Sequence, residues 1–365
     1  MLDFLSLKTE AFGLDISDFS LKIIKLKKKR DYLALASFGE ETIPPGIILE
    51  GEIKDEESLA KIIKKGFLEA KGEKLKTKYV ITSLPEEKTF LQVIQVPKMT
   101  EEELKKAVRF EAENYIPLPA AEAYLDFQVV QPFSDHLDHI DILLVALPKK
   151  IVDPYVSSIK KAGLIPVALE IESQAIARAV IKKGVSSFPL LLIDLGATRT
   201  SFIIFSGYSL RFTSSIPVSS QKFTEAIAKN LQVSLEEAEK LKVEYGLERD
   251  KKKGEIVFEA LIPALTDLIE QLKIHLRYYQ THSFHEHLPP DGHGVEKIFL
   301  FGGGANLKGL KDFISRELMI PVEIGNPWVN ILAEKPQEVP RLPYERSLGY
   351  TTALGLALRG VTRND

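Results

Sequence analysis

The stretch LLLIDLGATRTSFIIF, residues 190–205, carries the strongest local pattern in the chain. An apolar run ends at Asp194, a short turn contains Gly196, and a second β-rich run begins at Thr200, which is the pattern of a β-hairpin. A carboxylate at a strand end can hold the water shell of a magnesium ion. A glycine lets backbone N–H groups approach a phosphate, and the hydroxyls of Thr198 and Thr200 can donate to it. The same turn also occurs in hairpins that bind no ligand. The stretch therefore predicts a hairpin with the chemistry for a magnesium-bound phosphate.

A related pattern lies near the N-terminus. Residues 13–18 read GLDISD and precede an apolar run at 21–26. This second aspartate-bearing turn predicts a second hairpin. We expect the chain to contain two similar halves, each of which offers one aspartate, Asp15 or Asp194, to a shared cleft.

Composition limits the classes of protein to which the chain can belong. Its 365 residues are enough for about two to three domains, and 45% hydrophobic with 27% charged residues is typical of a soluble globular protein. A net charge of -3 indicates no nucleic-acid partner, and the lack of cysteine excludes disulfides and thiol chemistry. No uncharged apolar run reaches about 18 residues, and the N-terminus lacks a signal-peptide pattern. We therefore expect a cytoplasmic protein with no direct membrane span.

The hydrophobic pattern along the chain predicts alternating strands and helices. Residues 11–49 predict a sheet unit, followed by an amphipathic helix at 55–70. Residues 90–171 follow the order β-α-β-β-α-β, which predicts a compact α+β subdomain inserted between the two halves. A long helix is predicted at 255–281, with a kink at Pro263.

Two segments near the C-terminus are rich in small residues. The glycines at 302–304 lie between a predicted strand and a helix, where backbone N–H groups can meet an anion or a nucleotide. This loop lacks the Walker lysine and the dinucleotide-binding spacing, so it indicates neither of those sites. In the predicted helix at 344–359, Gly349, Ala353 and Ala357 are spaced by four, so we expect another helix to approach on their side.

Several longer segments resemble the PilM family of type IV pilus assembly proteins. This family belongs to the actin-like superfamily, and the division protein FtsA is similar to it. The likeness covers nearly the whole chain and includes segments outside the phosphate turns. The segments are 95–119, 144–179, 193–202, 234–247, 299–314 and 353–359.

The resemblance implies an α/β architecture: an actin-like (ribonuclease H-like) two-lobed fold with an inserted small α+β subdomain. The expected domains are a first lobe (1–83, 166–190 and 340–365), an inserted FtsA/PilM-type subdomain (84–165) and a second lobe (191–339, with a helical subdomain at 226–295).

The resemblance also implies ATP and Mg²⁺ as cofactors and assigns roles to matching positions. Asp15 and Asp194 would order Mg²⁺ through water. Glu170 or Glu172 lies in the segment that, in ATP-hydrolysing relatives, helps to position the attacking water. The implied cofactor-binding residues are Asp15, Ser17, Ser20, Lys22, Asp194, Gly196, Ala197, Thr198, Glu239, Lys242, Gly302, Gly303 and Gly304.

Two departures from the family pattern bear on catalysis. The first turn usually reads D-x-G-[ST], but here a serine follows Asp15-Ile16, and a positive φ at Ser17 would cost about 1–2 kcal/mol. We therefore expect a turn of different shape. Asp18 would also repel a γ-phosphate by about 3 kcal/mol unless magnesium or Lys22 offsets it. The second departure is at residues 219–220, which are serines where relatives usually carry a glycine pair. At most slow ATP hydrolysis is expected.

The function that the resemblance implies is that of an adaptor. It would recruit the cytoplasmic N-terminal peptide of a bitopic, PilN-like inner-membrane protein, and so lie at the inner membrane through its partner. Self-association is a further possibility. The peptide groove is expected between the first half and the inserted subdomain, near the helix at 103–118. There Tyr115, Ile116, Pro117 and Leu118 form an apolar helix end that is either a docking edge or an anchor of the subdomain's own core.

The alternatives are an ATP-hydrolysing, FtsA-like cytoskeletal or division protein and a homologue from a secretion or competence system. An FtsA-like protein would carry an amphipathic membrane helix after a C-terminal linker, which residues 360–365 do not suggest. A kinase of the same fold would need a catalytic aspartate in a substrate cleft, and no acidic residue stands out for that role.

Overall fold

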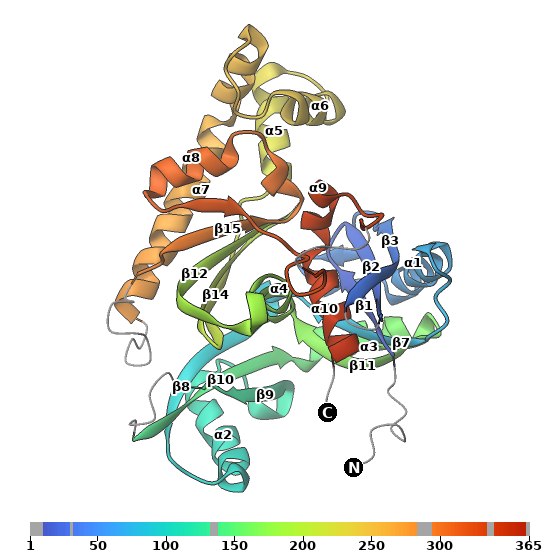
Figure 1. Ribbon diagram of the computed structural model, residues 1–365, viewed down its shortest axis with the longest axis vertical. Coiled ribbons are helices and arrows are strands. Elements are labelled where there is room, and N and C mark those ends of the chain that lie inside the picture. Colours follow the sequence, from blue (N-terminus) through green and yellow to red (C-terminus); the bar gives the residue numbers. More distant parts are fainter. Residues whose placement is uncertain (1–9, 30–31, 132–137, 283–293, 334–338, 363–365) are drawn as a thin grey trace.

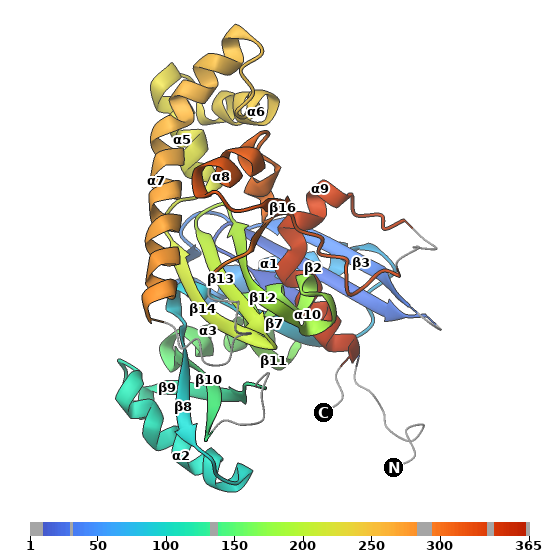
Figure 2. The ribbon, with the colours of Figure 1, turned by 60° about the vertical axis from the view of Figure 1, so that its left-hand side comes forward.

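The computed structural model describes residues 10–29, 32–131, 138–282, 294–333 and 339–362. Two large β-sheets form the centres of two lobes, and a third, smaller sheet lies to one side of them (Figures 1 and 2). The architecture is α/β, with the two lobes that the sequence predicts.

The first lobe is built on a six-stranded sheet of order β11-β7-β1-β2-β3-β6. The antiparallel hairpin β1–β2 is continued by β3, and β7 pairs with β1 in parallel. Every residue of β1 is buried, including Asp15 within its otherwise apolar sequence FGLDI. The strands are β1 (Phe12–Ile16), β2 (Ser20–Lys28), β3 (Leu33–Thr42), β6 (Lys71–Gly72), β7 (Tyr79–Leu84) and β11 (Ile165–Ile171), with a separate hairpin of β4 (Ile48–Leu49) and β5 (Glu52–Ile53).

The second lobe repeats this plan in a five-stranded sheet of order β14-β13-β12-β15-β16. Here β12 and β13 form the hairpin, β14 continues it, and β15 pairs with β12 in parallel. The repeated topology bears out the expectation of two similar halves. The strands are β12 (Ser186–Leu195), β13 (Thr200–Gly207), β14 (Ser209–Ile216), β15 (Lys297–Phe301) and β16 (Val322–Ile324).

Helices α4 (Glu172–Val180) and α10 (Thr351–Thr362) pack against each other beside β1 (Figure 1). A Cβ atom on Gly355 would lie 1.8 Å from the Ala175 carbonyl oxygen, so it is at Gly355 that the two helices approach closely. The side marked by Ala353 and Ala357 instead faces β1, where a Cβ on Gly13 would lie 2.4 Å from the Ala353 oxygen. The sequence correctly predicted a close helix contact but placed it on the wrong side of the helix.

The remaining helices cover the outer faces and build the end of the second lobe. α1 (Glu56–Glu69) packs on the first sheet and on α3 (Lys149–Lys161). The helix predicted at 255–281 runs from Lys252 to His282, through Pro263. The second-lobe helices are α5 (Ser220–Leu231), α6 (Leu235–Tyr245), α7 (Lys252–His282) and α8 (Leu310–Leu318), and α9 (Tyr344–Ser347) precedes α10. Short 3₁₀ turns are Glu86–Lys88, Ala120–Glu122, Lys182–Gly184, Gly303–Asn306 and Leu348–Tyr350.

A small module of three strands and one helix follows β7. Its sheet has the order β8-β10-β9, and α2 covers one face of it. The order β-α-β-β-α-β is present, but its last two members leave the module. α3 packs on α1, and β11 pairs with β7 at the edge of the six-stranded sheet. The module elements are β8 (Phe90–Pro97), α2 (Glu101–Tyr115), β9 (Ala123–Val129) and β10 (His139–Pro148).

A buried ion pair connects the module to the second lobe. Arg211 on β14 lies 3.6 Å from the Asp141 carboxylate on β10, and both side chains are buried. β8 also contacts β14. The module is thus held by contacts to both lobes. None of the described helices combines the length and the hydropathy that a membrane span requires.

Candidate functional site

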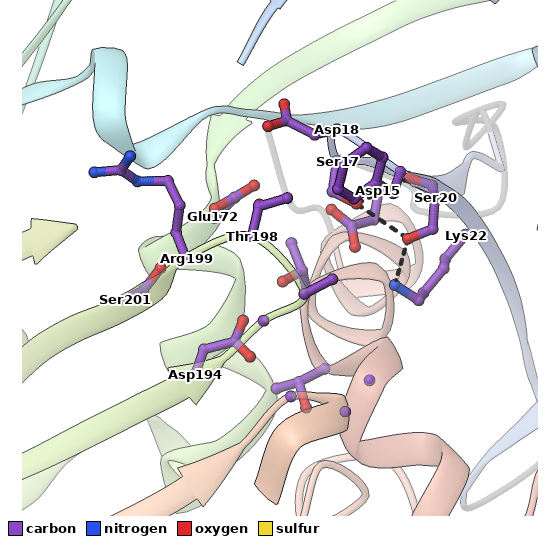
Figure 3. A pocket seen from close by; sticks show the side chains of 18 of the residues that line it. Asp15, Ser17, Asp18, Ser20, Lys22, Glu172, Asp194, Thr198, Arg199 and Ser201 are labelled. Carbon is purple, nitrogen blue, oxygen red and sulfur yellow. Dashed lines mark hydrogen bonds between the residues drawn. The ribbon is translucent and has the colours of Figure 1, made fainter. Parts of the chain in front are cut away.

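A cleft of about 500 Å³ lies where the turn after β1 meets the turn after β12. Asp15 and Asp194, each the next-to-last residue of its strand, both line it (Figure 3). Ser17, Ser20 and Lys22 line the same cleft from the first lobe. The two aspartate turns therefore face one shared space. The other predicted residues in its lining are Glu172, Gly196, Ala197, Thr198, Gly302 and Gly303.

Burial raises the pKa values of three carboxylates at the cleft floor, and the charge of Asp15 adds to the rise at the other two. Burial, and then the charge of Asp15, raises the pKa of Asp194 to about 6. Burial raises the pKa of Glu172 well above its usual range, with further contributions from Asp15 and Glu87. Burial also raises the pKa of Asp15. The charge of Lys22 and a 2.9 Å hydrogen bond from the Ser83 hydroxyl lower that pKa but do not cancel the rise. The floor is therefore short of positive charge.

Acidic side chains also outnumber basic ones around the rest of the cleft. Among its described lining residues, the acids are Asp15, Asp18, Glu40, Glu87, Glu172, Asp194 and Glu345, and the cations are Lys22, Arg199 and Arg346. Oxygen donors of this kind suit a hard divalent cation. In the described part of the chain, no three acidic or histidine side chains converge closely enough to ligate a metal directly.

The first turn is closed by its serines. The Ser17 N–H donates to the Ser20 carbonyl at 2.9 Å, and Lys22 Nζ donates to the Ser20 hydroxyl at 2.9 Å. Ser17 has no positive φ, so the turn avoids the strain and takes a different shape, as expected. Asp18 Oδ1 accepts a 2.9 Å hydrogen bond from the Gly51 N–H of the β4–β5 hairpin. This bond ties the Asp18 carboxylate to the cleft wall, whereas the sequence suggested a carboxylate aimed at a γ-phosphate.

The second turn is joined to the start of α5. The Gly196 N–H donates to the Arg199 carbonyl at 2.9 Å, and the Ser220 N–H donates back to the Gly196 carbonyl at 3.0 Å. Ser219 caps α5 by accepting from the Lys222 N–H. The serine pair that replaces the usual glycines therefore builds the helix start.

The three glycines at 302–304 differ in what surrounds them and in whether they line the cleft. Gly302 has φ +78°, and a Cβ atom there would lie 2.3 Å from Asp194 Oδ1. Only glycine leaves Asp194 room to point into the cleft. Gly303 lines the cleft, and its Cβ would meet nothing within 4 Å. Gly304 is buried, where a Cβ would lie 2.5 Å from Leu195 Cγ, and it does not line the cleft.

Glu239 and Lys242 lie outside this lining. Lys242 is 6% exposed and pairs with Glu239 at 2.7 Å. It also donates to the hydroxyls of Thr224 and Ser220 at 2.8 and 2.9 Å. This network ties α6 to α5. Contact of these two residues with a nucleotide stays a prediction.

Glu170 faces a second, larger space. It pairs with Arg178 on α4 and lies 3.5 Å from Arg359 on α10. This groove of about 780 Å³ runs between the module and the first lobe, and β9, β10, α3, β11 and α4 line it. Of the two glutamates proposed to position water, Glu172 lines the cleft and Glu170 lines the groove.

The predicted docking edge at residues 115–118 contributes to the module's own core. Ile116 is 7% exposed and packs among the buried residues under α2, with Leu118 against them. Tyr115 is 40% exposed. Ile116, Pro117 and Leu118 line a shallow surface hollow and are not part of the groove wall. A role in partner binding stays a prediction for these residues.

Sequence reasoning missed several residues that line the cleft. Arg199 donates to the Ser215 hydroxyl at 2.5 Å, and Glu87 has a pKa raised by burial. Tyr155 on α3 is buried and donates to the Gly51 carbonyl at 3.0 Å. Arg199 could have been found, because it belongs to the turn that carries Gly196. Tyr155 and Glu87 lie far from both turns in the sequence, so no local signal marked them.

Comparison with known proteins places the chain in a family. The family model described as type IV pilus assembly protein PilM matches residues 13–361. The chain belongs to the PilM family. A solved PilM structure, from a complex titled PilM-PilN type IV pilus biogenesis complex, superposes with a TM-score of 0.80 at 30% identity. The match covers 98% of this chain and 100% of that one.

More distant relatives are similar to this PilM-family chain in sequence or in its actin-like fold. Cell division protein FtsA of Pseudomonas aeruginosa is 24% identical over 221 residues, 56% of this chain and 50% of that protein. The chain thus matches about half the length of this curated relative. MreB5 of Spiroplasma citri bound to AMPPNP superposes with a TM-score of 0.56 at 14% identity, covering 97% of this chain and 96% of the other. At that identity the likeness concerns the fold alone.

Proposed function

We propose that this chain is an actin-like, nucleotide-binding adaptor of type IV pilus assembly. It recruits the cytoplasmic N-terminal segment of a PilN-like inner-membrane protein and lies at that membrane through its partner. The observation that carries the proposal is the 30% identity and TM-score of 0.80, over essentially both chains, with PilM from a PilM–PilN complex.

The cleft fits a magnesium–ATP ligand. Asp15 and Asp194 would hold the water shell of Mg²⁺, which supplies the positive charge that the acidic floor lacks. Lys22 on β2 and Arg199 in the turn after β12 bring cations from the two lobes, and Gly303 leaves its backbone uncovered. Glu172 is the candidate for orienting a water, but burial favours its neutral form, which is a poor acceptor for a proton. The residues thus support binding more than turnover.

The groove between the module and the first lobe is the proposed partner site. Its wall includes Val145 on β10 and Val156 on α3, with Glu170, Arg178 and Arg359 at one side. Apolar walls with a few charged groups are typical of peptide and small-molecule sites.

Peptide binding tests the adaptor role. The probe is a fluorescein-labelled peptide with the cytoplasmic N-terminal sequence of the PilN-like protein encoded in the same genome. We expect saturable binding to the full-length chain and at least a tenfold loss with Val156→Glu in the groove. Val243→Glu, at a 64% exposed position on α6, is the matched control and should bind like the wild type. No binding, or equal effects of the two variants, would refute the proposal.

Nucleotide binding and turnover test the cleft. We expect magnesium-dependent binding of a fluorescent ATP analogue that Asp194→Ala abolishes, with turnover below about 1 per second, the lower limit of the kinase range. Faster turnover that depends on Asp194 would instead favour the FtsA-like alternative.

A further inference from the structure

β9 is the end strand of the module sheet. In the described part of the chain it pairs with β10 alone, so its other side is an open edge. The Phe127 N–H donates to the carboxylate of its neighbour Asp126 at 2.9 Å. The Val130 N–H, by contrast, donates to the Asp141 carbonyl on β10. Because backbone groups alternate between the two sides of a strand, the Phe127 N–H lies on the open edge, together with those of Leu125 and Val129. Edges of this kind accept added strands unless they are protected.

The open edge lies between two hollows, one on each face of the sheet. The 780 Å³ groove lies on the face toward the first lobe, and a hollow of about 540 Å³ lies on the face covered by α2. Leu125, Asp126 and Phe127 line both. A strand laid along β9 would point alternate side chains into the two hollows, because the side-chain period of a strand is two.

The two hollows differ in chemistry. The first has an apolar part, to which Leu143, Val145 and Val156 belong, and a charged part around Glu170 and Arg178. Basic side chains outnumber acidic ones in the second: Lys105, Lys106 and Arg109 stand against Glu102 and Asp126.

Two hydrogen bonds hold β9 beside the first lobe. The Tyr124 hydroxyl donates to Asp153 on α3 at 2.9 Å, and Gln174 on α4 donates to the Gln128 side chain at 3.1 Å. These bonds fix both ends of the edge strand, so the edge is ordered before a ligand arrives. A preformed edge lowers the entropic cost of pairing.

We propose that the partner segment adds to the outer edge of β9 as a further strand. Residues of alternating type would suit it: apolar side chains toward the groove, and acidic or polar ones toward the basic hollow on the α2 side. Main-chain hydrogen bonds supply affinity in this mode, and the pockets for alternate side chains supply specificity. The inference rests on the proposed function, because the added strand is the segment of the PilN-like partner.

Hydrogen exchange at single amides tests the strand addition. The ¹⁵N-labelled full-length chain is measured with and without the partner peptide described above. We expect the Phe127 amide to exchange at least tenfold more slowly with peptide, while the Gln128 amide, which faces β10, changes little. Peptide that binds without slowing the Phe127 amide would overturn the strand addition and leave the adaptor role standing. If no peptide binds, the proposed function and this inference both fail.

The peptide itself provides a second test. N-methylation removes one backbone donor at a time, so a scan along the peptide should lower affinity at least fivefold at every second residue. A flat or aperiodic profile would contradict pairing with β9.

Substitution at Asp126 provides a third test. Asp126→Ala frees the Phe127 N–H, whereas Asp126→Asn keeps an acceptor for it while removing the same charge. Strand addition predicts that the alanine variant binds the peptide at least threefold more tightly than the asparagine variant. Equal affinities would count against the proposal.

Discussion

At the scale of single residues, Asp194 makes the stability of the ligand-free protein depend on pH. Its pKa rises from the ordinary 3.8 to about 6 on folding, so the folded state favours the neutral carboxyl. Asp194 therefore adds to the free energy of unfolding below about pH 4, and this gain is lost as the pH rises through about 6. The free energy of unfolding falls by about 3 kcal/mol between the two limits. Asp194→Asn should therefore stabilise the ligand-free protein above pH 7 and have no effect near pH 4, as measured by urea unfolding.

The control for this experiment is Asp267→Asn on the exposed side of α7. It should shift the unfolding midpoint equally little at both pH values. A gain for Asp194→Asn that does not depend on pH would show that packing, and not ionisation, is responsible.

Gly302 and Gly303 allow stability to be separated from ligand binding. Gly302→Ala should destabilise the fold by at least about 1–2 kcal/mol, because the backbone has φ +78° and the new Cβ meets Asp194. Gly303→Ala should leave stability within about 1 kcal/mol of the wild type while weakening nucleotide binding, since its Cβ would enter the open cleft. Thermal unfolding and nucleotide titration of both variants check this. Equal losses of stability would contradict it.

At the scale of elements, the contact between α4 and α10 depends on Gly355. A Cβ atom there would overlap the Ala175 carbonyl, so Gly355→Ala should cost at least about 2 kcal/mol in urea unfolding. Gly349→Ala, whose nearest neighbour would be 3.8 Å away, should change stability by less than about 1 kcal/mol. If both variants unfold alike, the helix pair is looser than described.

The elements also show how far local sequence patterns reach. The turns at Asp15 and Asp194 were predictable because each hairpin carries its own apolar runs and turn residues. The strand with which β11 pairs was not predictable in this way. β11 follows α3 in the predicted β-α-β-β-α-β unit, but its pairing with β7 is set by packing across the first lobe. For the same reason the sequence did not reveal that Lys242 is held by Glu239 and Thr224, or that Gly51 binds Asp18.

At the scale of the whole molecule, the ion pair between Arg211 and Asp141 couples the module to the second lobe. Both groups are buried, so Arg211→Met or Asp141→Leu alone removes the ion pair but keeps the other buried charged group, and should cost about 3–5 kcal/mol. The double variant should be clearly more stable than either single one. A double-mutant cycle by urea unfolding measures this coupling, and additive losses would mean that the pair does not join the two parts.

The cleft and the groove are lined by consecutive residues of the chain at one place. Glu172 lines the cleft, while Ile171 and Glu170 line the groove at the end of β11. We therefore expect a change of the backbone at this place to alter both spaces. A lesion at Ile171 should therefore be pleiotropic and damage both activities, whereas one at Gly303 or Val156 should damage a single activity.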